Sequence, residues 1–256
     1  MTSGIDDREF HKTAPVPSTG RPSIYELREP PVDLGAFLDE DLPRLRGARV
    51  LDAGSATGAY VPATLERARE LVAFDIAFGR VAAVDRRAAR VCGDVQSIPF
   101  ADGAFDVVMA MHMLYHVPDI PAAVRELRRV LRRDGVLYAL TNSERAQSEL
   151  RDLFVRSGGG NAMDVGDARF SNESGAALLR IAFSDVILHE DTSTRLVVRD
   201  AECVVDELQR LRYTLDIGTR VPWDELVTNA RRHAQAIIER DGAFVMSENH
   251  GLFTCR

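Results

Sequence analysis

The segment from Arg49 to Tyr60 reads RVLDAGSATGAY, an apolar run that reaches Asp52 and then passes through two glycines. The apolar run is typical of a buried β-strand, and the small residues after it indicate a tight turn into a helix. In doubly wound α/β folds such a turn is a common ligand site, because ligands bind beyond the carboxyl ends of the parallel strands. The segment therefore predicts the fold class and the edge of the sheet where a ligand binds.

Apolar runs of the same kind follow at ELVAFDI, ARVCGD, FDVVMAMH and GVLYALTN, separated by segments with helical periodicity. Most of these runs lack polar alternation, as expected for strands that are buried on both faces of a parallel sheet. We therefore predict an α/β fold with a doubly wound, mostly parallel sheet.

Beyond residue 142 the regular alternation weakens, although DVILHED and RLVVRD still read as strands. The patterns AECVVDELQRLR and WDELVTNARRHAQAIIER predict two helices, which form an insertion at about residues 200–240, before the last strand. The chain closes on AFVMSENHGLFTCR, which predicts a terminal hairpin around residues 249–251.

The first 22 residues are rich in Pro, Ser, Thr, Gly and charged side chains. This composition predicts a mobile N-terminal arm over residues 1–22, followed by one domain over residues 23–256. The arm has no apolar core of a signal peptide, and no stretch approaches the length that spans a membrane. We therefore expect a cytoplasmic protein that is not bound to a membrane.

The charges of the 256 residues exclude some partners, because 32 basic against 39 acidic residues give a net charge of −7. Such a chain repels a polyanion unless its basic residues gather on one face, so we expect no binding to DNA. The three cysteines, Cys92, Cys203 and Cys255, are far apart and lie in no Cys/His cluster, so we expect reduced thiols and no metal site.

The residues of the turn limit the classes of ligand that it can bind. A dinucleotide site needs G-x-G-x-x-G, but counting from Gly54 this chain has Ala56 and Ala59 at the second and third glycine positions. Instead, Asp52, Asp75 and Asp94 lie at the ends of successive predicted strands. Three carboxylates at one edge repel phosphates and favour an uncharged nucleoside that carries a cationic substituent. Adenosine attached to a sulfonium fits that description.

With these motifs the chain resembles the class I S-adenosylmethionine-dependent methyltransferases, particularly the small-molecule branch that includes the ubiquinone-type enzymes. VLDAGSATG resembles their first motif, FDI their acid after the second strand, and GDVQSIPFADGAFDVV their following segment. MLYHVPD and LRRVLRRDGVLYALTN complete a resemblance that covers about residues 48–143.

The resemblance implies a Rossmann-like methyltransferase fold, S-adenosylmethionine as the cofactor, and methyl transfer to an oxygen, nitrogen or carbon atom of a small molecule. It implies that Gly54, Ser55 and Gly58 lie against the methionine and ribose portions and that Asp75, followed by Ile76, accepts from the ribose hydroxyls. Asp94 and Val95 would hold the adenine ring, and Met111 would line the wall near the sulfonium. Asp52 either contacts the ligand or orders the turn.

His112 is the candidate general base, because it follows directly after the strand whose end faces the transferred methyl, and a histidine pKa near neutrality suits proton removal. In its alternative role the side chain packs against or caps the short helix that follows. Ala56 departs from the usual glycine, and we expect it to be tolerated only with a negative φ, since otherwise the loop must shift.

Two other functions stay open from the sequence. One is an RNA methyltransferase, although the acidic chain offers no basic accessory module. The other is a degenerate methyltransferase fold that binds a ligand without transferring a methyl group. The insertion at about residues 200–240 is interpreted as a helical cover over the substrate mouth, and its alternative is the surface of a homodimer.

Overall fold

The computed structural model of the chain describes residues 20–31, 33–160, 169–214 and 218–256. The prediction of a mobile arm over residues 1–22 lies outside the described residues except for its last three. Within those three, the Arg21 guanidinium forms an exposed ion pair with Asp206, with Nε 2.7 Å from Oδ2.

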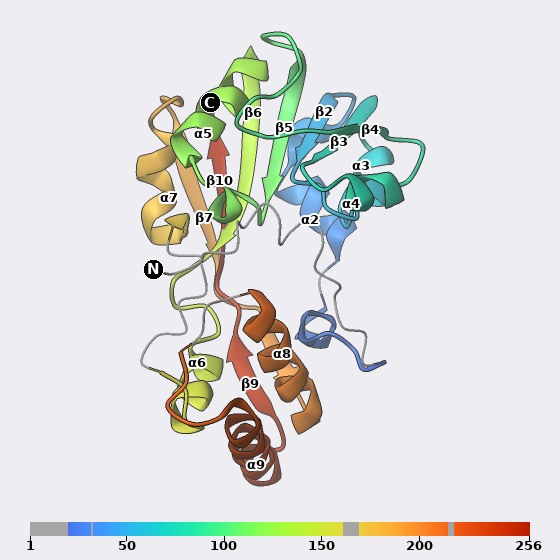
Figure 1. Ribbon diagram of the computed structural model, residues 1–256. Helices are drawn as coiled ribbons and strands as arrows, with labels where there is room; N and C mark the ends of the chain where they lie inside the picture. Colours follow the sequence, from blue (N-terminus) through green and yellow to red (C-terminus); the bar gives the residue numbers. More distant parts are fainter. Residues whose placement is uncertain (1–19, 32, 161–168, 215–217) are drawn as a thin grey trace.

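The main sheet confirms the predicted α/β class. Its seven strands lie in the order β4-β3-β2-β5-β6-β10-β7, and all run parallel except β10, which is antiparallel to both of its neighbours (Figure 1). The five apolar runs of the first half form β2 to β6, and DVILHED forms β7. The bounds are β2 Arg49–Ala53, β3 Glu70–Asp75, β4 Ala89–Cys92, β5 Phe105–Met111, β6 Leu131–Asn142, β7 Val186–Asp191 and β10 His250–Cys255.

Helices cover both faces of this sheet. On one face α2 (Leu34–Glu40), α3 (Val61–Leu65) and α4 (Phe78–Ala83) pack with residues such as Val50 and Val107. On the other face α5 (Ile120–Val130) and α7 (Asn172–Leu179) pack against Leu51 and Val108. Because consecutive residues of a strand point to opposite faces, an uninterrupted apolar run supplies both cores.

The helix α5 begins at a side-chain cap. The Asp119 side chain accepts a hydrogen bond from the Ala122 N–H at 2.9 Å, and Pro121 occupies the first turn. The helix ends at Val130, because Leu131 already has extended backbone angles and begins β6.

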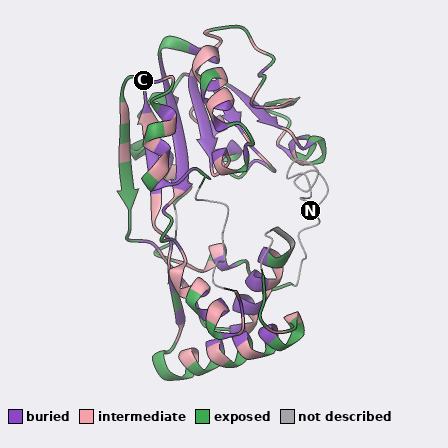
Figure 2. Cartoon of the chain, turned by 60° about the vertical axis from the view of Figure 1, so that its left-hand side comes forward, coloured by how far each residue is buried: buried purple, intermediate pink, exposed green. Residues whose placement is uncertain are grey.

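A second body, which we call the cap, lies beside the carboxyl ends of the main strands (Figure 1). Its antiparallel sheet has the order β1-β8-β9, and it has a hydrophobic core of its own that includes Leu150, Leu208, Leu226 and Met246 (Figure 2). The cap comprises η1 Ile24–Leu27, β1 Arg28–Glu29, α6 Ser148–Arg156, β8 Arg195–Val198, α8 Ala201–Thr214, α9 Trp223–Asp241 and β9 Phe244–Ser247. The predicted helical insertion is therefore present as α8 and α9, within a larger unit that has its own sheet.

The predicted terminal hairpin is wrong. β9 pairs with β8 in the cap, whereas β10 pairs with β6 and β7 in the main sheet. Asn249, with φ of 45°, turns the chain between the two sheets instead of folding one strand back on the other. The chain does turn at Asn249, but a turn does not determine which strands then pair.

The described residues contain no helix that is both long enough and apolar enough to span a membrane.

Candidate functional site

The turn after β2 begins at the carboxyl end of a central strand. Gly54, Ala56 and Gly58 all have positive φ, at 75°, 48° and 86°. The expectation that Ala56 needs a negative φ is therefore wrong. The left-handed conformation costs a non-glycine residue about 1 kcal/mol, and a hydrogen bond from the Ala56 N–H to Asp75 Oδ2 at 2.8 Å offsets this cost.

Asp75 is fixed at the end of β3 by two backbone donors. Its Oδ2 accepts from Ala56 and its Oδ1 accepts from the Ala77 N–H at 2.8 Å. Each carboxylate oxygen can accept more than one hydrogen bond, so this arrangement orients the group without exhausting it. Ile76, which follows, is half-buried and accepts a hydrogen bond at its carbonyl from the Cys92 thiol.

Asp52 lies one residue before the end of β2 and is almost fully buried. Burial, together with the nearby charge of Asp75, raises the pKa of Asp52 to about 7. The neighbouring Tyr60 is affected in turn, because its own burial and then the Asp52 charge raise the pKa of Tyr60 to about 12. The phenol therefore stays protonated and can donate a hydrogen bond at neutral pH.

The third predicted acid, Asp94, lies two residues after β4. Its Oδ1 accepts hydrogen bonds from the backbone N–H and the side-chain amide of Gln96, both at 2.9 Å. Val95 is buried in the core beneath this bend. The three aspartates thus stand at the carboxyl ends of neighbouring strands in the order β4-β3-β2, as the sequence predicts.

Two methionines lie at the end of β5 and directly after it. Met111 ends β5 and is packed in the core on the α2 face. Met113, which the sequence reasoning did not single out, packs against Gly54, where an added Cβ would lie 2.6 Å from the Met113 Cβ. Any side chain at position 54 would therefore collide with Met113, which gives a second reason for glycine there.

His112 follows β5 as predicted and has a positive φ of 53°, with its N–H bonded to the Leu140 carbonyl at 2.9 Å. Burial, then the neighbouring His250 and Arg28, lower the pKa of His112 to about 3. The expected pKa near neutrality is therefore wrong. The imidazole is neutral at physiological pH, but it is too weak a base to be well matched to proton removal.

Beside His112 lies an ion-pair network that sequence reasoning missed. Arg28 of the cap donates through Nε and Nη2 to the carboxylate of Glu248, which is 1% exposed. His250 places Nε2 3.1 Å from Glu248 Oε1 and Nδ1 2.9 Å from Asn142 Oδ1. Its ring centroid lies 5.3 Å from that of His112, edge to face.

The network keeps Glu248 charged. Burial alone would raise its pKa, but hydrogen bonds from His250 and Arg28 outweigh that effect and lower the pKa of Glu248 to about 2. Because Arg28 and Glu248 are 220 residues apart, no local signal in the sequence pairs them. Only the pairing of β1 with β8 and the switch at Asn249 bring them together.

The turn and the three carboxylates fit an adenosyl sulfonium. The Ser55 hydroxyl is buried and makes no hydrogen bond with the described residues, so a polar group on a bound ligand would satisfy it. The edge presents carboxylates and backbone groups around the turn, which suits hydroxyls and a positive charge.

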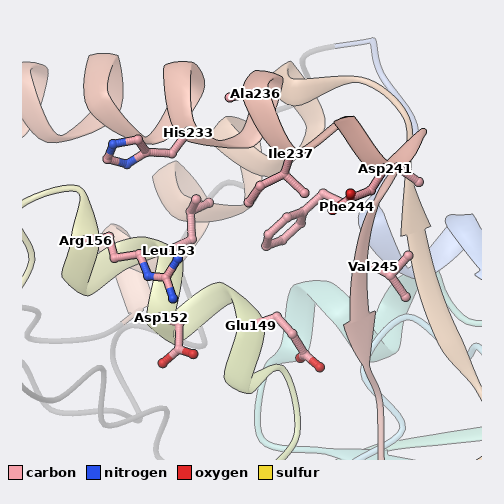
Figure 3. Close-up of a pocket in the computed structure, with 11 residues that line it drawn as sticks. Glu149, Asp152, Leu153, Arg156, His233, Ala236, Ile237, Asp241, Phe244 and Val245 are labelled. Atoms are coloured by element: carbon pink, nitrogen blue, oxygen red, sulfur yellow. The ribbon is translucent and has the colours of Figure 1, made fainter. Parts of the chain in front are cut away.

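A separate groove of about 720 Å³ lies within the cap, between α6, α9 and β9 (Figure 3). Glu149, Asp152 and Arg156 line it from α6, and His233 and Ile237 line it from α9. None of the residues predicted from the sequence for the cofactor or for catalysis lines this groove. Among the residues that the structure describes, no group of three or more His, Cys, Asp or Glu side chains could hold a metal ion.

Comparison with known proteins agrees with this geometry. Residues 51–139 match the profile of the methyltransferase domain family. The chain is 30% identical over 177 residues to the malonyl-[acyl-carrier protein] O-methyltransferase of Halorhodospira halophila, covering 64% of this chain and 57% of that protein. It is 37% identical over 92 residues to the demethylmenaquinone methyltransferase of Mycobacterium marinum, covering 36% and 40%.

The chain thus spans less than two thirds of the length of these relatives. Among solved structures, a SAM-dependent methyltransferase from Archaeoglobus fulgidus superposes with a TM-score of 0.52 at 17% identity, covering 87% of this chain and 93% of that one. This likeness shows that the fold is shared.

Proposed function

Because residues 51–139 form a methyltransferase domain of the class I, S-adenosylmethionine-dependent kind, we propose that this protein transfers a methyl group from S-adenosylmethionine to a small molecule. The observation that carries the proposal is the coupling of the turn to the second strand, in which Asp75 holds Ala56 through its backbone N–H. This bond holds Ala56 in the left-handed conformation that glycine adopts readily, which supports a cofactor site at this turn.

In this proposal, different residues at the strand ends bind different parts of the cofactor. Gly54, Ser55 and Gly58 lie against the methionine and ribose portions, and Asp75 with Ile76 takes the ribose. Asp94 and Val95 hold the adenine ring, and Met111 backs the wall near the sulfonium. Asp52 is close enough to Asp75 to share the positive charge of the ligand. The bound cofactor supplies a methyl group that is already electrophilic.

The remaining task of the chain is to position the acceptor and to exclude water. The cap is suited to this task, because Arg28 and Glu248 connect it to the edge where His112 lies. With a pKa of about 3, His112 is better suited to orienting the acceptor than to taking its proton. We therefore propose catalysis mainly by positioning.

The alternatives are less well supported. The Asp75 bond to Ala56 argues against a degenerate pocket. The acidic chain argues against RNA as the substrate. A homodimer and a cytoplasmic location remain predictions from the sequence.

A thermal-shift titration with S-adenosylmethionine and S-adenosylhomocysteine tests the proposal. At a hundredfold excess over Kd, binding adds about 2.7 kcal/mol to the free energy of unfolding, which corresponds to a rise in Tm of about 5 to 10 °C for a protein of this size. ADP is the matched control, because its phosphates would meet the three carboxylates. Equal shifts with all three compounds, or none, would refute the proposal.

A further inference from the structure

The guanidinium of Arg28 is only partly engaged. Its Nε and Nη2 donate to Glu248, while Nη1 makes no hydrogen bond with any described residue. The side chain is 25% exposed, and its carbon Cζ stands 5.3 Å from the centre of the Tyr25 ring. Arg28 therefore retains donors that the described residues do not use.

The groups around Arg28 form a set that suits an oxygen anion. The positive charge of Arg28 acts to lower the pKa of both Tyr60 and His112, so both side chains lie within electrostatic range of the guanidinium. The Tyr60 hydroxyl makes no hydrogen bond with the described residues, and the phenol is protonated at neutral pH. A guanidinium and a phenol are both hydrogen-bond donors to carboxylate oxygens.

The acids nearby do not cancel this preference. The carboxylate of Glu248 is already paired with Arg28 and lies within hydrogen-bond distance of His250. Asp52, with a pKa raised to about 7, is partly neutral at physiological pH. An incoming anion therefore meets less opposing charge than the number of carboxylates suggests.

On these observations, and resting on the function proposed above, we propose that the methyl acceptor is a carboxylate and that Arg28, assisted by Tyr60, binds it. One carboxylate oxygen supplies the electron pair of the new O–CH₃ bond. The S–CH₃ bond breaks, its electron pair stays on sulfur, and the products are a methyl ester and S-adenosylhomocysteine. No proton is transferred, which agrees with the low pKa of His112, the imidazole that directly follows β5.

Calorimetry on the protein saturated with S-adenosylhomocysteine tests this proposal without requiring turnover. The probes are octanoate, octanol and octylamine, which have chains of the same length and differ in the acceptor group. We expect octanoate to bind at least about tenfold more tightly than the other two, since one hydrogen bond between charged groups contributes this much or more. Similar affinities for all three probes, or no binding of octanoate, would overturn the proposal.

Two double variants test whether Arg28 causes the preference for octanoate. Arg28→Gln alone leaves Glu248 buried without its partner, so the double variant Arg28→Gln/Glu248→Gln, which removes both charges, keeps the test independent of folding. It should lose the preference for octanoate. The matched control is Arg231→Gln/Glu202→Gln, which removes an ion pair on the outside of the cap and should keep the preference. A double variant that retains the preference would exclude Arg28 as the binding residue.

The chemical product separates this inference from the proposed function. Alkali releases methanol from a methyl ester but not from a methylated amine or an ether. Methyl transfer to octylamine without transfer to octanoate would leave the proposed function intact and refute the carboxylate. Failure of S-adenosylhomocysteine to bind at all would refute both.

Discussion

The hydrogen bond between Ala56 and Asp75 joins residues that are 19 positions apart in the sequence, whereas the hydrogen bond between Arg28 and Glu248 joins residues that are 220 positions apart. The first contact belongs to the proposed cofactor half of the site, which the successive parallel strands β2 to β5 and the turns after them supply. The second belongs to the acceptor half, which requires the cap, the switch at Asn249 and the insertion of β10 between β6 and β7. The cofactor half is thus a local structure, and the acceptor half exists only when the whole chain is folded.

The two halves also hold their acids differently. Asp52 is buried next to Asp75, and its pKa is raised, while Glu248 is buried next to Arg28 and His250, and its pKa is lowered. The buried acid of the cofactor half therefore costs stability at neutral pH, and the buried acid of the acceptor half contributes to it. The following predictions test this contrast.

The largest effect is expected for Asp52→Asn. The pKa of Asp52 is raised to about 7 in the folded protein and lies near 4 in the unfolded chain. The contribution of this group to the free energy of unfolding is therefore fully present below pH 4 and is lost as the pH rises through 7. At pH 8 the variant should therefore be more stable than the wild type, by about 4 kcal/mol, and at pH 4 the two should be alike. Urea unfolding at both pH values measures this difference, and an equal difference at both would contradict the raised pKa.

Glu248→Ala should lower the free energy of unfolding, whereas Asp52→Asn raises it at pH 8. It leaves Arg28 without its carboxylate between the cap and the sheet, and breaking a buried pair in this way costs about 3 kcal/mol of unfolding free energy. The exposed pair of Arg87 and Asp85 offers a control, since Asp85→Ala should cost less than about 1 kcal/mol. Equal losses in the two variants would show that the acceptor half does not depend on this contact.

Asp75→Ala sharpens the description of the cofactor half. The variant loses the acceptor proposed for the ribose and also the bond that holds Ala56, so S-adenosylmethionine should bind more weakly by about 1.5 to 3 kcal/mol. Calorimetry on the folded variant measures the change. An unchanged dissociation constant would remove Asp75 from the ribose site.

The smallest effect is expected for His112→Ala and His112→Asn. Since a pKa of about 3 makes His112 a poor base, turnover at saturating substrate should fall less than about tenfold in both, short of the hundredfold or greater loss typical of a general base. A large loss in both variants, with cofactor affinity unchanged, would restore the catalytic role that the sequence suggested.

The sequence predicted the strands and the turn of the proposed cofactor half because their signals are local. Apolar runs marked β2 to β6, and small residues marked the turn from Gly54 to Gly58. Motif spacing then indicated the acids at the strand ends. The positive φ of Ala56 was missed, because the hydrogen bond that stabilises it comes from the neighbouring strand.

The acceptor half could not be predicted, since its contacts, apart from the one between Glu248 and His250, join distant parts of the chain. The sequence indicated strands at β8 and in the segment of β9, but β1 has only two residues, and no local pattern shows that these three strands form a sheet of their own. The turn at Asn249 predicted a hairpin, although β9 and β10 join different sheets. The pKa of His112 depends on Arg28 and His250, which only the tertiary fold brings near.

Hydrogen exchange with and without S-adenosylhomocysteine tests the central claim most directly, because it locates the ligand on the intact chain. We expect slower exchange of backbone amides at residues 54–58, 75–77 and 94–96, with little change along the groove between α6 and α9. Protection confined to residues 149–156 and 233–245, with the turn after β2 unaffected, would place the ligand in the cap groove and contradict the proposed cofactor site.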